Sequence, residues 1–306
     1  MTWKRLSTAV FVLLALATSG LVARHFARTG WPLHQANFWL VGVAALIFLF
    51  SYAAKAWGWQ RLFSDGERPA VLTLAAAGGA ASVGGLALPG RCDEVIRVAV
   101  VRRCRRRTAS YGAVALSIVV LGLIDSAAMT PLAAVALAAV HLGGWLQVGL
   151  AVVIAAGVGA AGVVLALPRI ATFGFVARYR MGRWLRENAT PRREAVWAWV
   201  GVALSWALRS LATFVLLAAL GFGANLALAI AFVCASAASA VLPVAPAGAA
   251  MQAGAGAAIL VAAGVHGEEA VAFGIAAQAL VMCAGAAFVL GLGAWHAQGR
   301  VQLARR

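Results

Sequence analysis

A group of charged residues directly after a Pro-Gly pair is the part of this chain best suited to chemistry. Two guanidinium and two carboxylate groups follow Pro89-Gly90 in an otherwise apolar region: Arg91, Asp93, Glu94 and Arg97. Arginine binds phosphate through paired hydrogen bonds, and carboxylates can orient such arginines or relay protons. Charges at membrane depth are usually functional, so this group predicts a binding site.

The Pro-Gly pair predicts a break between two helices. Pro89 lacks a backbone donor and Gly90 tolerates unusual φ angles, so a helix should end there. Residues 93–103 have helical spacing, and their first turn carries Asp93 and Glu94, where carboxylates suit the helix dipole. Arg97 lies four residues after Asp93, which permits an ion pair on one helix face.

Two interpretations of this break stay open. One is an ordinary capped helix at the membrane surface. The other is a re-entrant segment, in which residues 71–90 dip into the bilayer and return. A full crossing would separate the arginines of residues 102–107 from the charged loop at 61–68, so the charge pattern favours the re-entrant interpretation.

Composition places the chain among multi-pass membrane proteins. Apolar residues make up 63% of the 306 residues, and the mean hydropathy is +0.91, whereas soluble domains are about 45–50% apolar. We expect an all-α polytopic bundle that forms a single domain over residues 1–306, with about six to eight spans. The apolar segments are 9–23, 38–57, 71–88, 109–133, 145–167, 196–220, 226–242, 249–265 and 270–295. A cleaved signal peptide is the alternative for the first of these.

The net charge of +16 reflects Arg-rich loops, which predict sidedness rather than nucleic-acid binding. Residues 60–70, 91–107 and 168–194 and both termini are expected in the cytoplasm. Residues 134–144, 221–225 and 266–269 are neutral or acidic and are expected outside. Residues 24–37 are assigned outside as well, although they carry two arginines.

A second Pro/Gly break divides the later part of the chain. The residues Pro243, Pro246 and Gly248 separate the apolar segments 226–242 and 249–265. These segments either cross fully or form a second hairpin. Two broken hairpins, one in each half, would make the inverted repeat known from transporters. An eight-span bundle without pseudo-symmetry is the alternative.

Asp125 and Arg209 both lie inside apolar segments, and we predict that they pair. At about 1.5 Å per residue, Asp125 and Arg209 lie within ~5 Å of the same depth. Each alone would cost roughly 2.5–3.5 kcal/mol to insert, so each needs a partner or a wet cavity. The competing interpretation places Arg209 at a headgroup cavity and pairs Asp125 with Arg91 or Arg97.

The two broken segments resemble a known family. Residues 88–97 resemble the "PGR-x-x-E-x-x-R" signature of the lysylphosphatidylglycerol synthase transmembrane (flippase-like) family, and residues 242–248 resemble its later "P-x-x-P-x-G" element. With the hydropathy pattern, the likeness covers most of the chain. The sequence departs from the family where Leu121 and Gly122 replace a Glu-Arg pair and where Gln252 and Ala253 replace an Arg-Glu pair.

The resemblance implies movement of a lipid or lipid-linked molecule between leaflets, with anionic phospholipid headgroups as the partners. Arg91, Arg97 and Arg209 would attract the phosphate, and Asp93, Glu94 and Asp125 would orient them; Gln252 is included because it replaces a charged family residue. One alternative is an accessory protein for a lipid-modifying or glycosyl-transfer enzyme, which the missing charges favour. Another is a membrane enzyme that uses Asp93 or Glu94 as a base.

Other chemistry has little support in the sequence. The four cysteines have no metal-ligand spacing, and neither a Ser-His-Asp nor an HExxH pattern occurs. No ATP-binding motif occurs in these 306 residues, and we expect no aminoacyl-transfer domain of the kind fused to some family members. We therefore expect a protein that is not an enzyme and needs no cofactor or metal. The oligomeric state is left open.

Overall fold

The computed structural model is all-helical in the part it describes, which is residues 21, 24–28, 30, 36–87, 92–104, 110–140, 144–170, 190–241 and 248–304. Five helices are long and apolar enough to cross a membrane. They are α2 (Phe38–Gln60), α5 (Tyr111–Ala139), α6 (Gly144–Ile170), α9 (Arg192–Ala219) and α12 (Gly267–Ala304). The shorter elements are η1 (Asp65–Glu67), α3 (Val71–Ala87), α4 (Cys92–Cys104), α10 (Leu226–Val241) and α11 (Gly248–Ala262).

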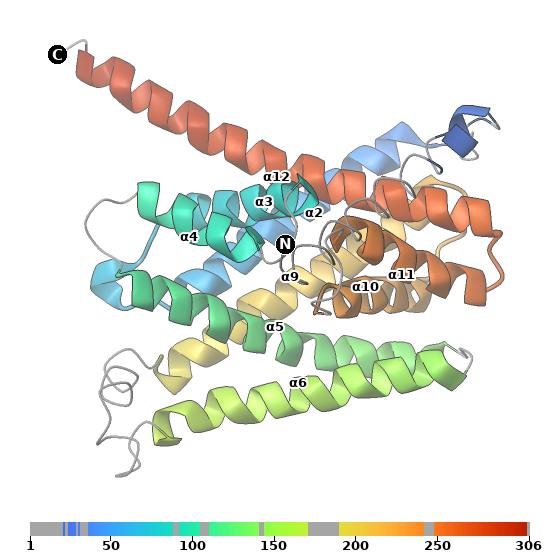
Figure 1. Cartoon of the computed structure of the whole chain (residues 1–306), viewed down its shortest axis with the longest axis horizontal. Helices are drawn as coiled ribbons and strands as arrows, with labels where there is room; N and C mark the ends of the chain where they lie inside the picture. Colours follow the sequence, from blue (N-terminus) through green and yellow to red (C-terminus); the bar gives the residue numbers. More distant parts are fainter. Residues whose placement is uncertain are drawn as a thin grey trace, which may run out of the picture.

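The predicted helical membrane bundle is confirmed, and most helix ends fall within a few residues of the apolar segments read from the sequence. The largest difference is α12, which continues beyond residue 295 to Ala304 and extends past the rest of the bundle (Figure 1). Most of the first predicted span, 9–23, and most of the basic loop at 168–194 lie outside the described residues.

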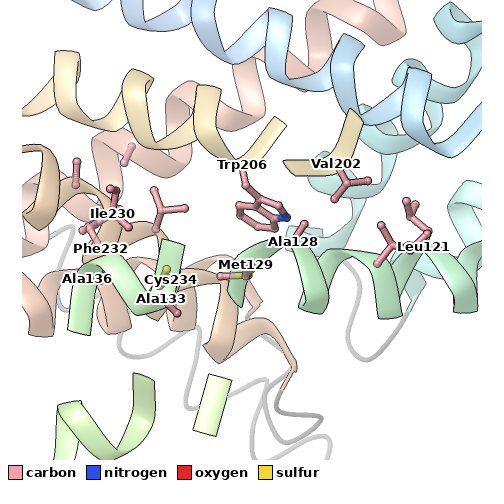
Figure 2. Packing of buried hydrophobic residues seen from close by; sticks show 14 of the residues in the cluster. Leu121, Ala128, Met129, Ala133, Ala136, Val202, Trp206, Ile230, Phe232 and Cys234 are labelled. Carbon is pink, nitrogen blue, oxygen red and sulfur yellow. The ribbon is translucent and has the colours of Figure 1, made fainter. Parts of the chain in front are cut away.

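The outer faces of the helices are apolar, as contact with lipid requires. The side chains of Trp39, Trp145 and Trp295 are largely exposed and lie near the ends of apolar helix segments, where tryptophan prefers the membrane–water interface. The interior combines many alanines with leucine, valine and isoleucine side chains and a few aromatic ones, and the alanines let the helices approach closely. Figure 2 shows part of this interior between α5, α9 and α10.

The short helices form two hairpins, one on each side of the bundle (Figure 1). In the first hairpin, Gly84 of α3 lies so close to Ile96 of α4 that a Cβ atom would displace the end of the Ile96 side chain. In the second, the Ser236 hydroxyl of α10 donates to the Gln252 carbonyl oxygen of α11 at 2.9 Å. Both Pro/Gly breaks therefore join helices that return along each other, as the re-entrant interpretation requires of the first break.

Helices α2 and α9 pack antiparallel along their whole length at the centre of the bundle. At one end, the backbone N–H of Asn37 donates to the carbonyl oxygen of Ala219 at 2.9 Å. At the other end Gly58 meets Gly201, and a Cβ atom at Gly58 would lie only 2.7 Å from the Ala198 carbonyl oxygen. The two glycines thus permit the closest contact of the pair.

The order long–short–short–long occurs twice along the chain, first as α2 to α5 and then as α9 to α12. The offset in sequence from each helix to its counterpart is nearly constant, because the first set begins at Phe38, Val71, Cys92 and Tyr111 and the second at Arg192, Leu226, Gly248 and Gly267. A short helix of each set also packs on the last long helix of the other set: α3 packs on α12, and α10 packs on α5. Since the equivalent helices α2 and α9 are antiparallel, this arrangement agrees with the predicted inverted repeat rather than with a bundle without pseudo-symmetry.

Contacts at the helix ends agree with the predicted grouping of loops. At one end, Glu194 pairs with Arg68 at 3.0 Å and with Arg61 at 3.6 Å, which joins two loops assigned to the cytoplasm. At the other end, His25 contacts Glu268 at 3.1 Å, which joins two loops assigned outside. The same two residues line a hollow at that end, away from the charges inside the bundle. Which end faces the cytoplasm stays a prediction.

Candidate functional site

The most enclosed ion pair of the described residues joins α2 to α5. The Lys55 ammonium donates to an Asp125 carboxylate oxygen at 2.7 Å, and the two side chains are 19% and 21% exposed. Asp125 lies at the midpoint of α5, as far from its first residue as from its last. Charges in such a place need compensation, and these two supply it to each other.

Trp206 of α9 completes this group. Its indole Nε1 donates to the second carboxylate oxygen of Asp125 at 3.0 Å, and its ring centre lies 5.5 Å from the Lys55 ammonium nitrogen. Figure 2 shows the Trp206 ring reaching from α9 toward α5 among apolar side chains. The carboxylate is therefore bound by one cation and one neutral donor.

Arg209 lies one turn further along α9 without such compensation. Its guanidinium carbon is 5.0 Å from the Trp206 ring centre and 5.3 Å from that of Tyr52. Its Nε atom is buried, and it has no hydrogen-bond partner among the residues that the structure describes. Arg209 is also the single charged side chain between residues 195 and 267, so its own half of the chain offers no nearby acid.

The predicted Asp125–Arg209 ion pair is wrong. Both residues do lie beside Trp206, which agrees with the expectation of a shared depth. The carboxylate of Asp125, however, faces Lys55. Depth along a helix does not determine which neighbouring helix a side chain faces. Pairing of Asp125 with Arg97 is likewise not observed among the described contacts.

The inverted repeat relates these residues in pairs. Counted from the first residues of α2 and α9, Lys55 and Arg209 hold the same position, and so do Tyr52 and Trp206. Counted in the same way along α5 and α12, Asp125 holds the position of Val281.

The contacts follow the same relation. Trp206 donates to the Asp125 side chain, and Tyr52 donates to the Val281 carbonyl oxygen at 3.3 Å. Lys55 lies over the Trp206 ring as Arg209 lies over the Tyr52 ring. The two half-sites therefore correspond in these contacts, but one has an acid where the other has valine, and Arg209 also lies 5.0 Å from the Trp206 ring centre.

The charged residues of the first motif approach this centre through α4. Arg97 pairs with Asp93 at 3.7 Å across one turn of α4, as predicted. Helix α4 in turn packs on α5, the helix that carries Asp125. Glu94 is partly buried in the first turn of α4, while Arg91, Pro89 and Gly90 lie outside the described residues.

The second motif lies apart from these charges. The Gln252 side-chain oxygen accepts a hydrogen bond from the Gln278 amide of α12 at 3.3 Å, so Gln252 links α11 to α12. Gly248 is the first residue of α11, and Pro243 and Pro246 lie outside the described residues. Gln252 is therefore placed as a link within the second half, and the described residues show no contact between it and the charged centre.

The sequence interpretation did not identify Lys55, Tyr52, Trp206 or Gln278. The one available signal for Lys55 was its charge inside an apolar segment, near tryptophans that suggested a membrane interface. The hydroxyl of Tyr52 and the indole of Trp206 gave no signal, because aromatic residues are common in any membrane helix. Their importance appears only when α2 and α9 are placed side by side.

Among the residues that the structure describes, no group of histidine, cysteine or acidic side chains could hold a metal ion. The family model for the lysylphosphatidylglycerol synthase TM region matches residues 5–299, which is nearly the whole chain. No protein of curated function and no solved structure matches it.

Proposed function

Because the chain belongs to the lysylphosphatidylglycerol synthase TM family of membrane proteins in lipid metabolism, we propose that it moves a lipid or lipid-linked molecule between the two leaflets of the membrane. The observation that carries the proposal is Arg209, a partly buried cation without an acidic partner among the described residues. A cation inside a helical bundle is costly unless something compensates it. A lipid headgroup that passes between the halves would do so.

The inverted repeat supports this proposal on independent grounds. Transporters of this design hold their substrate between the repeats and expose it to either side by rocking one repeat against the other. Here the charged centre lies where α2 and α9, the equivalent helices of the two repeats, meet α5 and α12. The Lys55–Asp125 pair would keep this region polar, and no ATP-binding motif is present, so movement would be passive or coupled to an ion.

We further propose that the protein is not an enzyme and that its partners are membrane lipids with anionic headgroups. Of the two acids in the first motif, Asp93 forms an ion pair with Arg97 of the same helix. A carboxylate that pairs with arginine in this way is less free to take a proton from a substrate. The accessory role remains the second candidate, since α11 lacks the charges that the family often carries.

Reconstitution into liposomes with a headgroup-labelled phosphatidylglycerol tests the proposal. A membrane-impermeant quencher reports the fraction of label that reaches the outer leaflet, and lipid extraction reports any chemical change. We expect faster translocation than in protein-free liposomes and an unchanged lipid. A modified lipid would support an enzyme, and neither effect would support the accessory role.

A further inference from the structure

The two half-sites differ in one respect, and this difference identifies a ligand. In the first half-site the Asp125 carboxylate accepts from Lys55 at 2.7 Å and from Trp206 at 3.0 Å. In the second half-site Arg209 and Tyr52 occupy the equivalent positions, but Val281 stands where the acid would be. The second half-site thus has both donors and lacks the anion.

We propose that the missing anion is supplied by the substrate, as the singly charged phosphodiester of a lipid headgroup that binds Arg209 beside Tyr52. The inference rests on the proposed lipid translocation and adds the substrate class and the place where it binds. Asp125 then shows, within the same protein, how an oxyanion is held at this position of the repeat.

The charges of the centre set the charge of the ligand. Lys55 and Asp125 cancel each other, and Arg97 and Asp93 do the same. Arg209 has no acid beside it among the described residues, so a ligand with one negative charge would compensate it. A phosphodiester carries one negative charge and two free oxygens, which suit the forked donors of a guanidinium group.

The surroundings of Arg209 select an amphiphilic ligand over a free ion. Val281 packs with an apolar cluster of buried residues around Tyr52, formed by Phe48, Tyr52, Ala212 and Ala284. The Tyr52 hydroxyl is also within 2.7 Å of the Ser82 hydroxyl, so its donor could turn from Ser82 or Val281 to an incoming oxygen. An apolar wall beside a cation fits a headgroup joined to acyl chains.

Restoring the acid to the second half-site tests the inference. In V281D the new carboxylate would stand toward Arg209 as Asp125 stands toward Lys55, and it would compete with the substrate. V281N has nearly the same size and polarity without the charge. Binding of short-chain phosphatidylglycerol to the purified full-length protein is measured by titration calorimetry, with the corresponding neutral diacylglycerol and inorganic phosphate as comparison ligands.

We expect V281D to bind phosphatidylglycerol at least about ten-fold more weakly than V281N, and the wild type not to bind the neutral diacylglycerol. Equal affinities of V281D and V281N would overturn the inference. So would binding of inorganic phosphate but not of the lipid, because the site would then take a free anion. If V281D does not fold, the affinities of R209Q and R209K for phosphatidylglycerol are compared instead. R209K retains the positive charge and should bind the lipid more tightly than R209Q. Equal affinities would contradict the inference.

This test separates the binding site from the proposed function. If V281D loses binding as expected while the wild type moves no lipid in liposomes, the phosphodiester site stands and translocation fails. If the wild type moves lipid and V281D binds it as well as V281N does, translocation stands and the site assignment fails.

Discussion

Lys55 and Arg209 occupy equivalent positions in the two halves of an inverted repeat, at the same distance along the chain from the first residues of α2 and α9. Each lies over an aromatic ring contributed by the other half, Lys55 over Trp206 and Arg209 over Tyr52. Only Lys55 has an acid beside it among the described residues, at 2.7 Å. The repeat therefore has a cation at the same place in both halves, and only one of the two cations has an acidic partner among the described residues.

The Lys55–Asp125 pair should stabilise the fold. D125N leaves the Lys55 ammonium without an acid in an apolar bundle, and we expect a loss of about 3 kcal/mol, at the low end for a buried pair because a fifth of each side chain is exposed. Thermal unfolding in detergent measures it. The exchange K55D with D125K should recover most of the loss, whereas D125R with R209D should not. Recovery of stability by D125R with R209D, but not by K55D with D125K, would show that Asp125 pairs with Arg209 and not with Lys55.

The contact between α2 and α9 depends on glycine. G58A places a Cβ atom 2.7 Å from the Ala198 carbonyl oxygen, and G201A places one 2.8 Å from the Gly58 α-carbon. We expect each to destabilise the protein by about 1–3 kcal/mol, the usual cost of overpacking. G122A is the matched control, because its Cβ atom would meet nothing within 4 Å. Unfolding midpoints of G58A and G201A equal to that of G122A would show that the helices are further apart.

The sequence was sufficient for the spans and favoured the first hairpin, because hydropathy and the Pro89-Gly90 pair report local chain behaviour. It left the second hairpin open between two interpretations. It was insufficient for the charged centre, since Asp125 could have faced Arg209, Arg97 or Lys55 at a similar depth. Which helices lie side by side is decided by packing at positions such as Gly58 and Gly201, which join α2 to α9, and a glycine in a membrane helix does not by itself say which helix it contacts.

The repeat was also present in the sequence but hard to detect. The two halves share helix spacing and the basic position at Lys55 and Arg209, while the residues around these positions differ. Asp125 matches Val281, and α4 carries five charged residues where α11 carries none. Charge asymmetry of this kind conceals a structural repeat from any comparison of residue types.

The sidedness of the bundle is open to a direct test. We expect cysteines at positions 105 and 183 to be reached by a thiol reagent from the cytoplasmic side, and a cysteine at position 268 from outside, because arginine-rich loops stay inside. The background lacks Cys92, Cys104, Cys234 and Cys283. Labelling of position 105 from outside would contradict the re-entrant hairpin, since α4 would then end on the wrong side.

The first motif should be needed for activity and dispensable for insertion. R91A removes a guanidinium from the break, and E94A removes a partly buried carboxylate from the first turn of α4. We expect both proteins to reach the membrane at normal level and to lose translocation. E67A, in the short η1 element of a loop, is the control. Full translocation by both motif variants would make the motif structural.

The most direct test of the central claim compares R209Q with R193Q for translocation of headgroup-labelled phosphatidylglycerol in liposomes. Both changes remove one arginine from α9, but Arg193 is exposed in the first turn, whereas the Arg209 Nε atom is buried without a partner among the described residues. We predict that R209Q slows translocation by about ten-fold or more, as loss of a charged hydrogen bond would, and that R193Q keeps the wild-type rate. Equal rates for the two variants would contradict the account.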